Sequence, residues 1–205
     1  MKLALIGYRI QEKYNTGTVR DEDRDLFDYL TGRRIDLHYE VWNDPDVQWA
    51  VYDAVILKSP WDYHEKYEEF LTWMDSLTPL GVQVFNSAQV VRWNSDKHYL
   101  KDIHDSGLPT IPTCYLEKNT AVEPGHHYFR ELNTSRLVIK PCISAGAKNT
   151  ILVSPEEFPA QIPHINAWLK EEAYMIQPFV EEIRTGEWSL LFFGGKIQPQ
   201  PVKNT

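Results

Sequence analysis

Short apolar runs alternate with amphipathic stretches through the first part of the chain, and this alternation constrains the fold more than any other feature. Two stretches, 21–30 and 67–77, space their apolar residues as helices do. Four runs have the length and content of buried strands: 3–7, 35–42, 52–57 and 81–86. Strands and helices that alternate at these intervals predict an open parallel α/β sheet up to about residue 90.

Beyond residue 90 the order of elements changes. A helix is predicted over 96–106, because Gly107 and Pro109 follow it as a stop signal. A stretch over 155–170 is predicted to be helical in part, divided by Pro159 and Pro163. Extended segments are predicted at 110–116, 136–140, 150–153, 174–177 and 188–193, with a hairpin turn at Gly194–Gly195. We therefore expect an α/β domain over 1–90 and a second, α+β region over 91–205.

The charge balance and the cysteine count limit the class of protein. The formal net charge is −8, from 29 acidic and 21 basic side chains, so nucleic acid is excluded as a general partner. Only Cys114 and Cys142 are present, which is too few for a disulfide framework and predicts a reducing, cytoplasmic setting. The first apolar run breaks at Tyr8–Arg9, too early for a signal peptide or a membrane span. We expect a soluble protein with no membrane contact.

Two lysines stand where a phosphate could bind. Lys140 ends an apolar strand, and the small-residue turn that follows, with Ser144 and Gly146, could bring backbone N–H groups close to an anion. Lys97 lies in the predicted first turn of a helix, where the helix dipole disfavours a cation. From spacing alone, Lys140 is more often a solvated strand end, and Lys97 a surface lysine paired with Asp96 or Asp102.

A stiff extended segment lies between the last predicted strands. Gln177, Pro178, Phe179 and Val180 form a crossing that could present a backbone carbonyl and an N–H side by side, as adenine recognition requires. Glu187, further on, could accept hydrogen bonds from ribose hydroxyl groups. The alternative is a solvated acidic loop around 181–182.

Trp61 and Asp62 follow the strand at 52–57, at the end where open α/β sheets place their ligand crevice. They are candidate substrate contacts, and the alternative is a helix cap with aromatic packing. No Walker motif and no GxGxxG pattern occurs, and His126–His127 lacks zinc-site spacing. We predict no metal-binding residues.

Taken in order, several short stretches resemble the ATP-grasp superfamily, in particular its glutathione-synthetase-like members and the group near cycloserine-biosynthesis ligases. Each stretch is short, but their order and separation cover most of the chain from residue 53 on. The matching stretches are 53–63, 84–87, 91–100, 107–113, 138–141, 177–180 and 186–190.

The resemblance implies a role for each candidate residue. The sheet over 1–90 would be the preATP-grasp domain. Lys97 and Lys140 would hold the ATP phosphates, and residues 144–148 would form the mobile loop that covers them. The segment 177–180 would read adenine, and Glu187 would bind ribose. The implied activity is the ATP-dependent joining of a small-molecule carboxylate to an amine through an acyl phosphate, with two Mg²⁺ ions.

The sequence departs from the family pattern at its end. No acidic residue follows Glu187, whereas the family continues into a lobe that holds the magnesium ions. We therefore expect an incomplete, truncated ATP-grasp region that binds ATP without turnover, and we assign no catalytic residue and no magnesium ligand. The alternative is a non-catalytic nucleotide-binding or protein-interaction module. Strand edges near Phe192–Phe193 predict self-association into a homo-oligomer.

Overall fold

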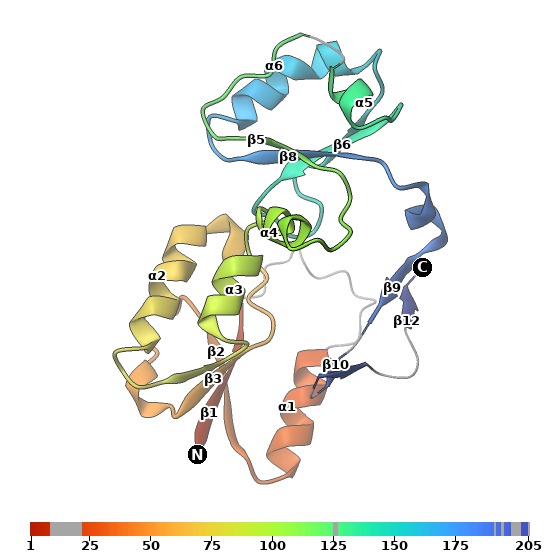
Figure 1. Ribbon diagram of the computed structural model, residues 1–205. Helices are drawn as coiled ribbons and strands as arrows, with labels where there is room; N and C mark the ends of the chain where they lie inside the picture. Colours follow the sequence, from red (N-terminus) through yellow and green to blue (C-terminus); the bar gives the residue numbers. More distant parts are fainter. Residues whose placement is uncertain (9–21, 125–126, 191, 194, 198–201, 205) are drawn as a thin grey trace. The chain divides into compact units, whose positions relative to one another are not determined.

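The computed structural model describes residues 1–8, 22–124, 127–190, 192–193, 195–197 and 202–204 (Figure 1). The chain forms two compact units. The first consists of Met1–Thr110 together with Pro141–Asn149, and the second of Ile111–Lys140 together with Thr150–Thr205. This division differs from the predicted boundary after residue 90, because residues up to 110 and the segment 141–149 belong to the first unit.

The first unit is built on a four-stranded sheet, as the alternating pattern predicts. All three pairings are parallel, and the strand order is β2-β1-β3-β4. The strands are β1 (Lys2–Gly7), β2 (Asp36–Val41), β3 (Ala54–Leu57) and β4 (Gln83–Phe85). Each lies within its predicted run or starts one residue before it.

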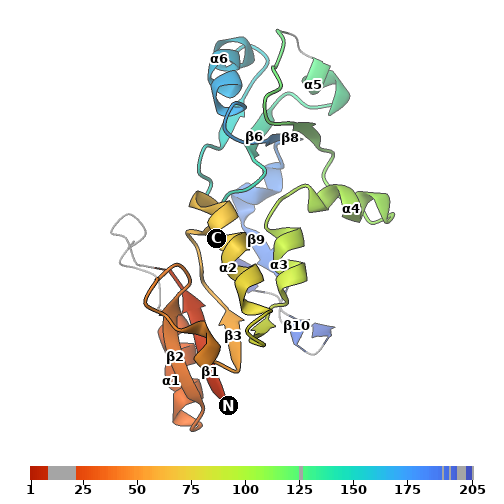
Figure 2. The ribbon, with the colours of Figure 1, turned by 90° about the vertical axis from the view of Figure 1, so that its left-hand side faces the viewer.

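Both faces of this sheet are apolar and covered by helices. Ala4 and Ile6 of β1 belong to the buried cluster that includes the inner face of α2 (Tyr67–Leu77). Leu3 and Leu5, which alternate with them, belong to the cluster packed against α1 (Glu22–Gly32). Figures 1 and 2 show the two helices on opposite sides of the sheet. A strand buried on both faces explains the continuous apolar run in the sequence.

The helices after β4 correct the prediction of one helix over 96–106. A helix that was not predicted, α3 (Ala88–Asn94), begins at Ser87, whose hydroxyl accepts from the Val90 N–H at 3.3 Å. A turn follows, and α4 (Tyr99–Asp105) begins three residues later than expected. The stop signal is confirmed: Gly107 follows α4 with φ +86°, a value that favours glycine. Two 3₁₀ turns complete the unit, η2 (Trp49–Val51) and η3 (Tyr63–Glu65).

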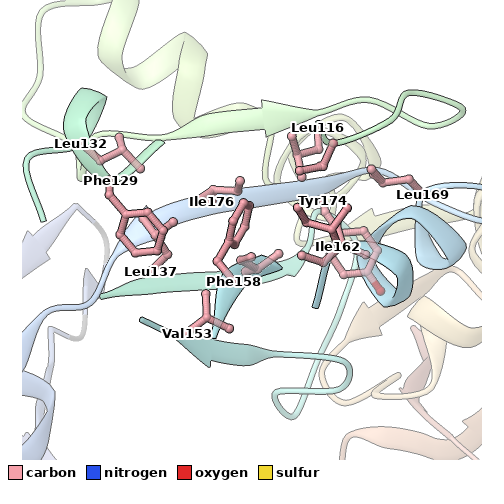
Figure 3. Close-up of a cluster of buried hydrophobic side chains, with 13 residues drawn as sticks. Leu116, Phe129, Leu132, Leu137, Val153, Phe158, Ile162, Leu169, Tyr174 and Ile176 are labelled. Carbon is pink, nitrogen blue, oxygen red and sulfur yellow. The ribbon is translucent and has the colours of Figure 1, made fainter. Parts of the chain in front are cut away.

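The second unit contains a different sheet, with strand order β5-β8-β6-β7. β5 pairs with β8, and β6 with β7, in the antiparallel sense. Its core consists of thirteen buried side chains between the strands and two helices (Figure 3). The elements are β5 (Cys114–Leu116), α5 (His127–Glu131), β6 (Leu137–Pro141), β7 (Ile151–Val153), α6 (Phe158–Trp168) and β8 (Tyr174–Pro178).

The prediction that two prolines divide the helix at 155–170 is wrong. Pro159 lies in the first turn of α6, where its missing N–H has no partner to lose, and Pro163 lies inside the same continuous helix. Packing stabilises this helix: Phe158, Ile162 and Ile165 are buried in the core, and Trp168 stacks on Tyr174 with ring centroids 5.4 Å apart. Burial outweighs the local cost of a proline.

The last part of the chain forms short strands after the 3₁₀ turn η4 (Glu181–Thr185). β9 (Glu187–Ser189) pairs with β12 (Val202–Asn204), and β10 (Phe192–Phe193) pairs with β11 (Lys196–Ile197). The predicted strand 188–193 is thus two strands. The pairing of β10 with β11 confirms the hairpin at Gly195, and Gly194 lies outside the described residues. In the part of the chain that the structure describes, no helix has the length and apolarity to cross a membrane.

Candidate nucleotide-binding site

Lys97 forms hydrogen bonds with the segment 141–144, at the end of β6. It lies in the turn between α3 and α4, so the prediction that it occupies the first turn of a helix is wrong. Its Nζ donates to Ser144 Oγ at 2.9 Å and to the carbonyl oxygens of Ser144, Cys142 and Pro141 at 3.1, 3.2 and 3.3 Å. Its backbone N–H also donates to the Cys142 carbonyl at 2.9 Å. Lys97 therefore connects the turn 95–98 to the segment 141–144.

The two carboxylates considered as partners of Lys97 have other hydrogen bonds. Asp96 accepts from His98 Nδ1 at 2.6 Å, and Asp102 accepts from the Trp93 indole at 2.7 Å. Four oxygen atoms surround an ammonium group that carries three protons, which is a strongly favourable setting for a cation. The surface-lysine alternative does not describe this environment.

The segment Pro141–Asn149 bends through left-handed backbone. Gly146, Ala147 and Asn149 have φ of +61°, +56° and +52°. A Cβ at Gly146 would meet nothing within 4 Å, so glycine is needed there for its backbone angle rather than for space. The predicted small-residue turn is confirmed, and it contains Ser144, the residue that binds Lys97.

In the second unit, Lys140 projects from β6 on the face opposite the core. Leu137 and Ile139 are fully buried in the core cluster, and Val138 and Lys140 alternate with them. Lys140 is half-buried. This placement does not match a fully solvated strand end, which was the alternative.

Gln177 lies on the same face, on the neighbouring strand β8. Tyr174 and Ile176 enter the core, whereas Met175 and Gln177 alternate with them. The Gln177 side chain is 5% exposed and its amide donates to Thr113 Oγ1 at 2.8 Å. Lys140 and Gln177 thus share one face of adjacent strands.

The predicted adenine-reading segment leaves β8 beside the start of β6. The Phe179 N–H donates to the Arg136 carbonyl at 3.0 Å, so this N–H is already used within the protein. The Phe179 ring lies near two guanidinium groups, 4.7 Å from Arg136 and 5.5 Å from Arg184. Both arginines also pair with Glu181, at 3.2 and 3.0 Å.

The alternative of a solvated acidic loop fits the exposure of this segment. The Glu181 side chain is exposed, and it pairs with Arg136 and Arg184. Val180 is 39% exposed and precedes η4. Glu187 begins β9 directly after Gly186, whose φ is +100°.

Trp61 and Asp62 lie after β3 in the first unit, at the predicted end of the sheet. Asp62 is 6% exposed and accepts a hydrogen bond from the Trp42 indole at 2.7 Å. Its side chain makes no cap bond to η3, so the capping part of the alternative is wrong. The next residue, Tyr63, packs against Phe70 with ring centroids 5.6 Å apart, which fits the aromatic-packing part. Trp61 is 55% exposed.

Sequence reasoning missed two polar groups at this end of the sheet. Asn86, with φ +62°, follows β4 and donates from its amide to the Leu57 carbonyl at 2.7 Å. Ser59 donates to Asp23 at 2.7 Å. The signal for Asn86 was its place directly after a strand, because asparagine tolerates left-handed backbone.

The described residues contain no cluster of carboxylates that could bind the magnesium ions implied by the resemblance. One group of three potential ligands lies there within binding distance, and it consists of Asp96, His98 and Cys142. A thiol and an imidazole suit softer metals than Mg²⁺, which prefers oxygen ligands. We therefore derive no step through magnesium.

The two sheets and their connections define the chain as a protein with the ATP-grasp fold. A crystal structure of a RimK domain protein with this fold, from Sphaerobacter thermophilus DSM 20745, superposes with a TM-score of 0.59 at 16% identity, over 88% of this chain and 64% of that one. The crystal structure of D-cycloserine synthetase DcsG gives a TM-score of 0.82 at 23% identity, over 99% of this chain and 71% of that one.

Sequence comparison narrows the resemblance further. Residues 4–86 match the family model for the N-terminal domain of D-cycloserine synthetase DcsG. The chain is 30% identical over 164 residues to the cycloserine biosynthesis protein DcsG of Streptomyces lavendulae. The alignment covers 75% of this chain. The chain spans about half, 52%, of that relative's length. The predicted resemblance to ATP-grasp ligases of the cycloserine-biosynthesis group is confirmed.

Proposed function

We propose that this chain binds ATP and corresponds to part of an ATP-dependent carboxylate–amine ligase. The observation that carries the proposal is the face of the second sheet opposite its core, where Lys140 lies on β6 and Gln177 on the adjacent β8. The fold and the DcsG match support it, since ATP-grasp proteins are named for this nucleotide.

The second unit has suitable groups for the two ends of a nucleotide. The segment Gln177–Val180 leaves β8 beside Arg136, at the start of β6, and Lys140 lies four residues further along β6. Four residues of strand span about 13 Å. We propose that the segment contacts adenine, that Glu187 binds the ribose, and that Lys140 binds a phosphate.

In the first unit, Lys97, Ser144 and Gly146 are proposed phosphate contacts. Phosphate oxygens carry full negative charge and are stronger acceptors than the neutral carbonyls that now surround the Lys97 ammonium. Nucleotide binding is therefore expected to draw Lys97 Nζ away from some of these carbonyls. The backbone of the segment around Gly146 would then supply N–H donors to the same phosphates.

Trp61 and Asp62 remain candidate contacts for the carboxylate or amine substrate. Because Asp62 is already bonded to Trp42, we propose that Asp62 holds the segment in place and that the exposed Trp61 ring makes the contact. The D-cycloserine synthetase in the comparison makes D-cycloserine, by its name. A small-molecule carboxylate and a small amine are the proposed substrate classes.

Amide formation needs magnesium ligands that the described residues do not provide. We propose that turnover requires carboxylate ligands for magnesium beyond the described residues. Formation of an amide by residues 1–205 with ATP and magnesium would contradict this part of the proposal.

A second candidate function, a nucleotide-binding or interaction module without catalysis, makes a different prediction. Such a module would bind ATP but would show no gain of ligase activity in any longer protein that contains this chain. Measuring ATP-dependent amide formation in a longer protein, with candidate amino acids as substrates, separates the two.

The binding test is calorimetric titration of ATP into the wild-type chain, Lys140→Ala and Lys118→Ala. Lys118 is an exposed lysine of the same unit and serves as the matched control. One lost charged contact costs about 1.5–3 kcal/mol, so we expect Lys140→Ala to weaken binding about 10-fold or more. Lys118→Ala should bind as wild type does. Equal affinity in all three proteins would remove Lys140 from the site.

A further inference from the structure

The fold brings together three side chains that the nucleotide proposal does not use. Asp96 and His98 lie in the turn between α3 and α4, and Cys142 lies just after β6. One potential ligand atom from each lies within 4.8 Å of the others. Cys142 is 1% exposed, and the other two are half-buried. All three belong to the first unit.

Hydrogen bonds of Lys97 hold the two segments of this cluster together. Lys97, which stands between Asp96 and His98, donates its N–H to the Cys142 carbonyl at 2.9 Å. Its Nζ donates to Ser144 Oγ at 2.9 Å. These bonds fix the turn against the segment 141–144, so the thiol meets the other two groups without any rearrangement of the chain.

The imidazole and the carboxylate are already paired. Asp96 Oδ1 lies 2.6 Å from His98 Nδ1 and also accepts from the His98 backbone N–H at 3.0 Å. A carboxylate has no proton to give, so Nδ1 donates the proton in this pair. A metal ion bound by all three groups would take the place of that proton between Asp96 Oδ1 and His98 Nδ1, and the proton would move to Nε2.

We propose that Cys142, His98 and Asp96 form a site for a thiophilic divalent metal, with Zn²⁺ as the type case. The three supply a thiolate, an imidazole and a carboxylate, the number and kind of protein ligands that an open zinc site uses. Ligand atoms around zinc lie about 3.5 Å apart, as follows from bond lengths of about 2.0–2.3 Å. Separations of up to 4.8 Å therefore close with side-chain rotations alone.

The charges also balance. A thiolate and a carboxylate neutralise the two charges of Zn²⁺, so the loaded site carries no net charge beside the Lys97 ammonium. Mg²⁺ is disfavoured at the same place, because a thiolate is a poor ligand for a hard cation.

Metal binding would act on the nucleotide site through Lys97. A metal joined to residues on both sides of Lys97 and to Cys142 would hold the turn and the segment 141–144 in their present arrangement. ATP, under the function proposed above, needs Lys97 to leave some of these carbonyls. Zinc is therefore expected to lower ATP affinity, and this consequence rests on the proposed function whereas the metal site does not.

The site is tested with Co²⁺, which gives a near-ultraviolet charge-transfer band when a thiolate binds it. The wild-type chain and Cys114→Ser should show the band at one cobalt per chain, and added Zn²⁺ should abolish it. Cys114 is a suitable control, because burial and then Glu131 raise the pKa of its thiol to about 11. Cys142→Ser should lose the band, and His98→Gln should weaken cobalt binding at least 10-fold.

A second measurement covers the case in which Cys142→Ser does not fold. Excess Zn²⁺ should slow alkylation of Cys142 in the wild-type chain, measured by mass spectrometry, and leave the rate at Cys114 unchanged. No band in the wild-type chain, a band that survives Cys142→Ser, or equal alkylation of Cys142 with and without zinc would overturn the site.

The effect on nucleotide binding is measured separately. We expect Zn²⁺ to weaken ATP binding at least 10-fold in the wild-type chain and to leave His98→Gln unaffected. Unchanged ATP affinity with a confirmed cobalt band would overturn the regulatory consequence alone. An absence of ATP binding without metal would overturn the proposed function and leave the metal site standing.

Discussion

The two sheets of this protein differ in how they use their faces. In the first unit both faces are apolar, and α1 and α2 cover one each. In the second unit the described hydrophobic cluster lies on one face, against α5 and α6, and the other face carries the polar Lys140 and Gln177 beside the buried Met175. A sheet buried on both sides has only its strand ends for chemistry, whereas a sheet with one apolar face can present a functional face.

The largest effect is expected from the core of the second unit. Phe158 is fully buried and meets Phe129 edge to face at 5.8 Å. Phe158→Ala should cost about 3–5 kcal/mol of unfolding free energy. Chemical denaturation measures this loss. The control is Phe192→Ala, because the Phe192 side chain is 62% exposed. A loss below about 1 kcal/mol would mean that the one-sided core does not hold the second unit together.

The buried hydrogen bond at the end of the first sheet should matter less. Trp42→Phe keeps an aromatic ring in the core but leaves the Asp62 carboxylate without its indole donor. A buried acceptor left unsatisfied costs about 1–3 kcal/mol. Chemical denaturation of Trp42→Phe measures this cost. Trp61→Phe is the control, because the Trp61 ring is exposed. Equal stability of the two variants would mean that the Trp42 hydrogen bond does not stabilise Asp62, and Asp62 would again be a candidate substrate contact.

A helix cap in the first unit should have a smaller effect. Ser87 accepts from the Val90 N–H at the start of α3. Ser87→Ala should destabilise the first unit by about 1 kcal/mol, and Ser87→Asp, which retains an acceptor, should stay near wild type. If hydrogen exchange in α3 is the same in Ser87→Ala as in wild type, the cap does not hold the helix.

The smallest effect concerns pH and the second unit. The Cys114 thiol has its pKa raised from 9.0 to about 11, by burial first and then by Glu131. The folded state therefore favours the neutral thiol, and this contribution is fully present below pH 9 and is lost as the pH rises towards 11. We expect a fall in stability between pH 9 and 11 that Cys114→Ser reduces. Identical pH slopes for the two proteins would contradict this.

Much of the fold could be predicted because strong periodic patterns decide it. The helix at 67–77 has the predicted ends, since its apolar spacing persists over three turns and sets a buried face. The helix α3 was missed because it has seven residues and two of its large apolar side chains, Val90 and Trp93, are exposed. The proline-containing α6 was misjudged because core packing overrides a local preference.

The candidate site was predicted as a set of residues, and its contacts could not be predicted. Lys97, Lys140 and the segment 177–180 became candidates through the order and separation of the family-like stretches. The partners of Lys97 are 44 to 47 residues away, and those of Asp62 and Gln177 are 20 and 64 residues away, so no local pattern reports them. For the same reason the group of Asp96, His98 and Cys142 was not visible in the sequence.

The central claim is that Lys140 binds a phosphate group of ATP from the face opposite the core. Calorimetric titration of ATP and of adenosine into the wild-type chain and Lys140→Gln separates the phosphates from the base. The account predicts a loss of about 10-fold or more for ATP and no change for adenosine. Equal losses for both ligands, or no loss for either, would contradict it.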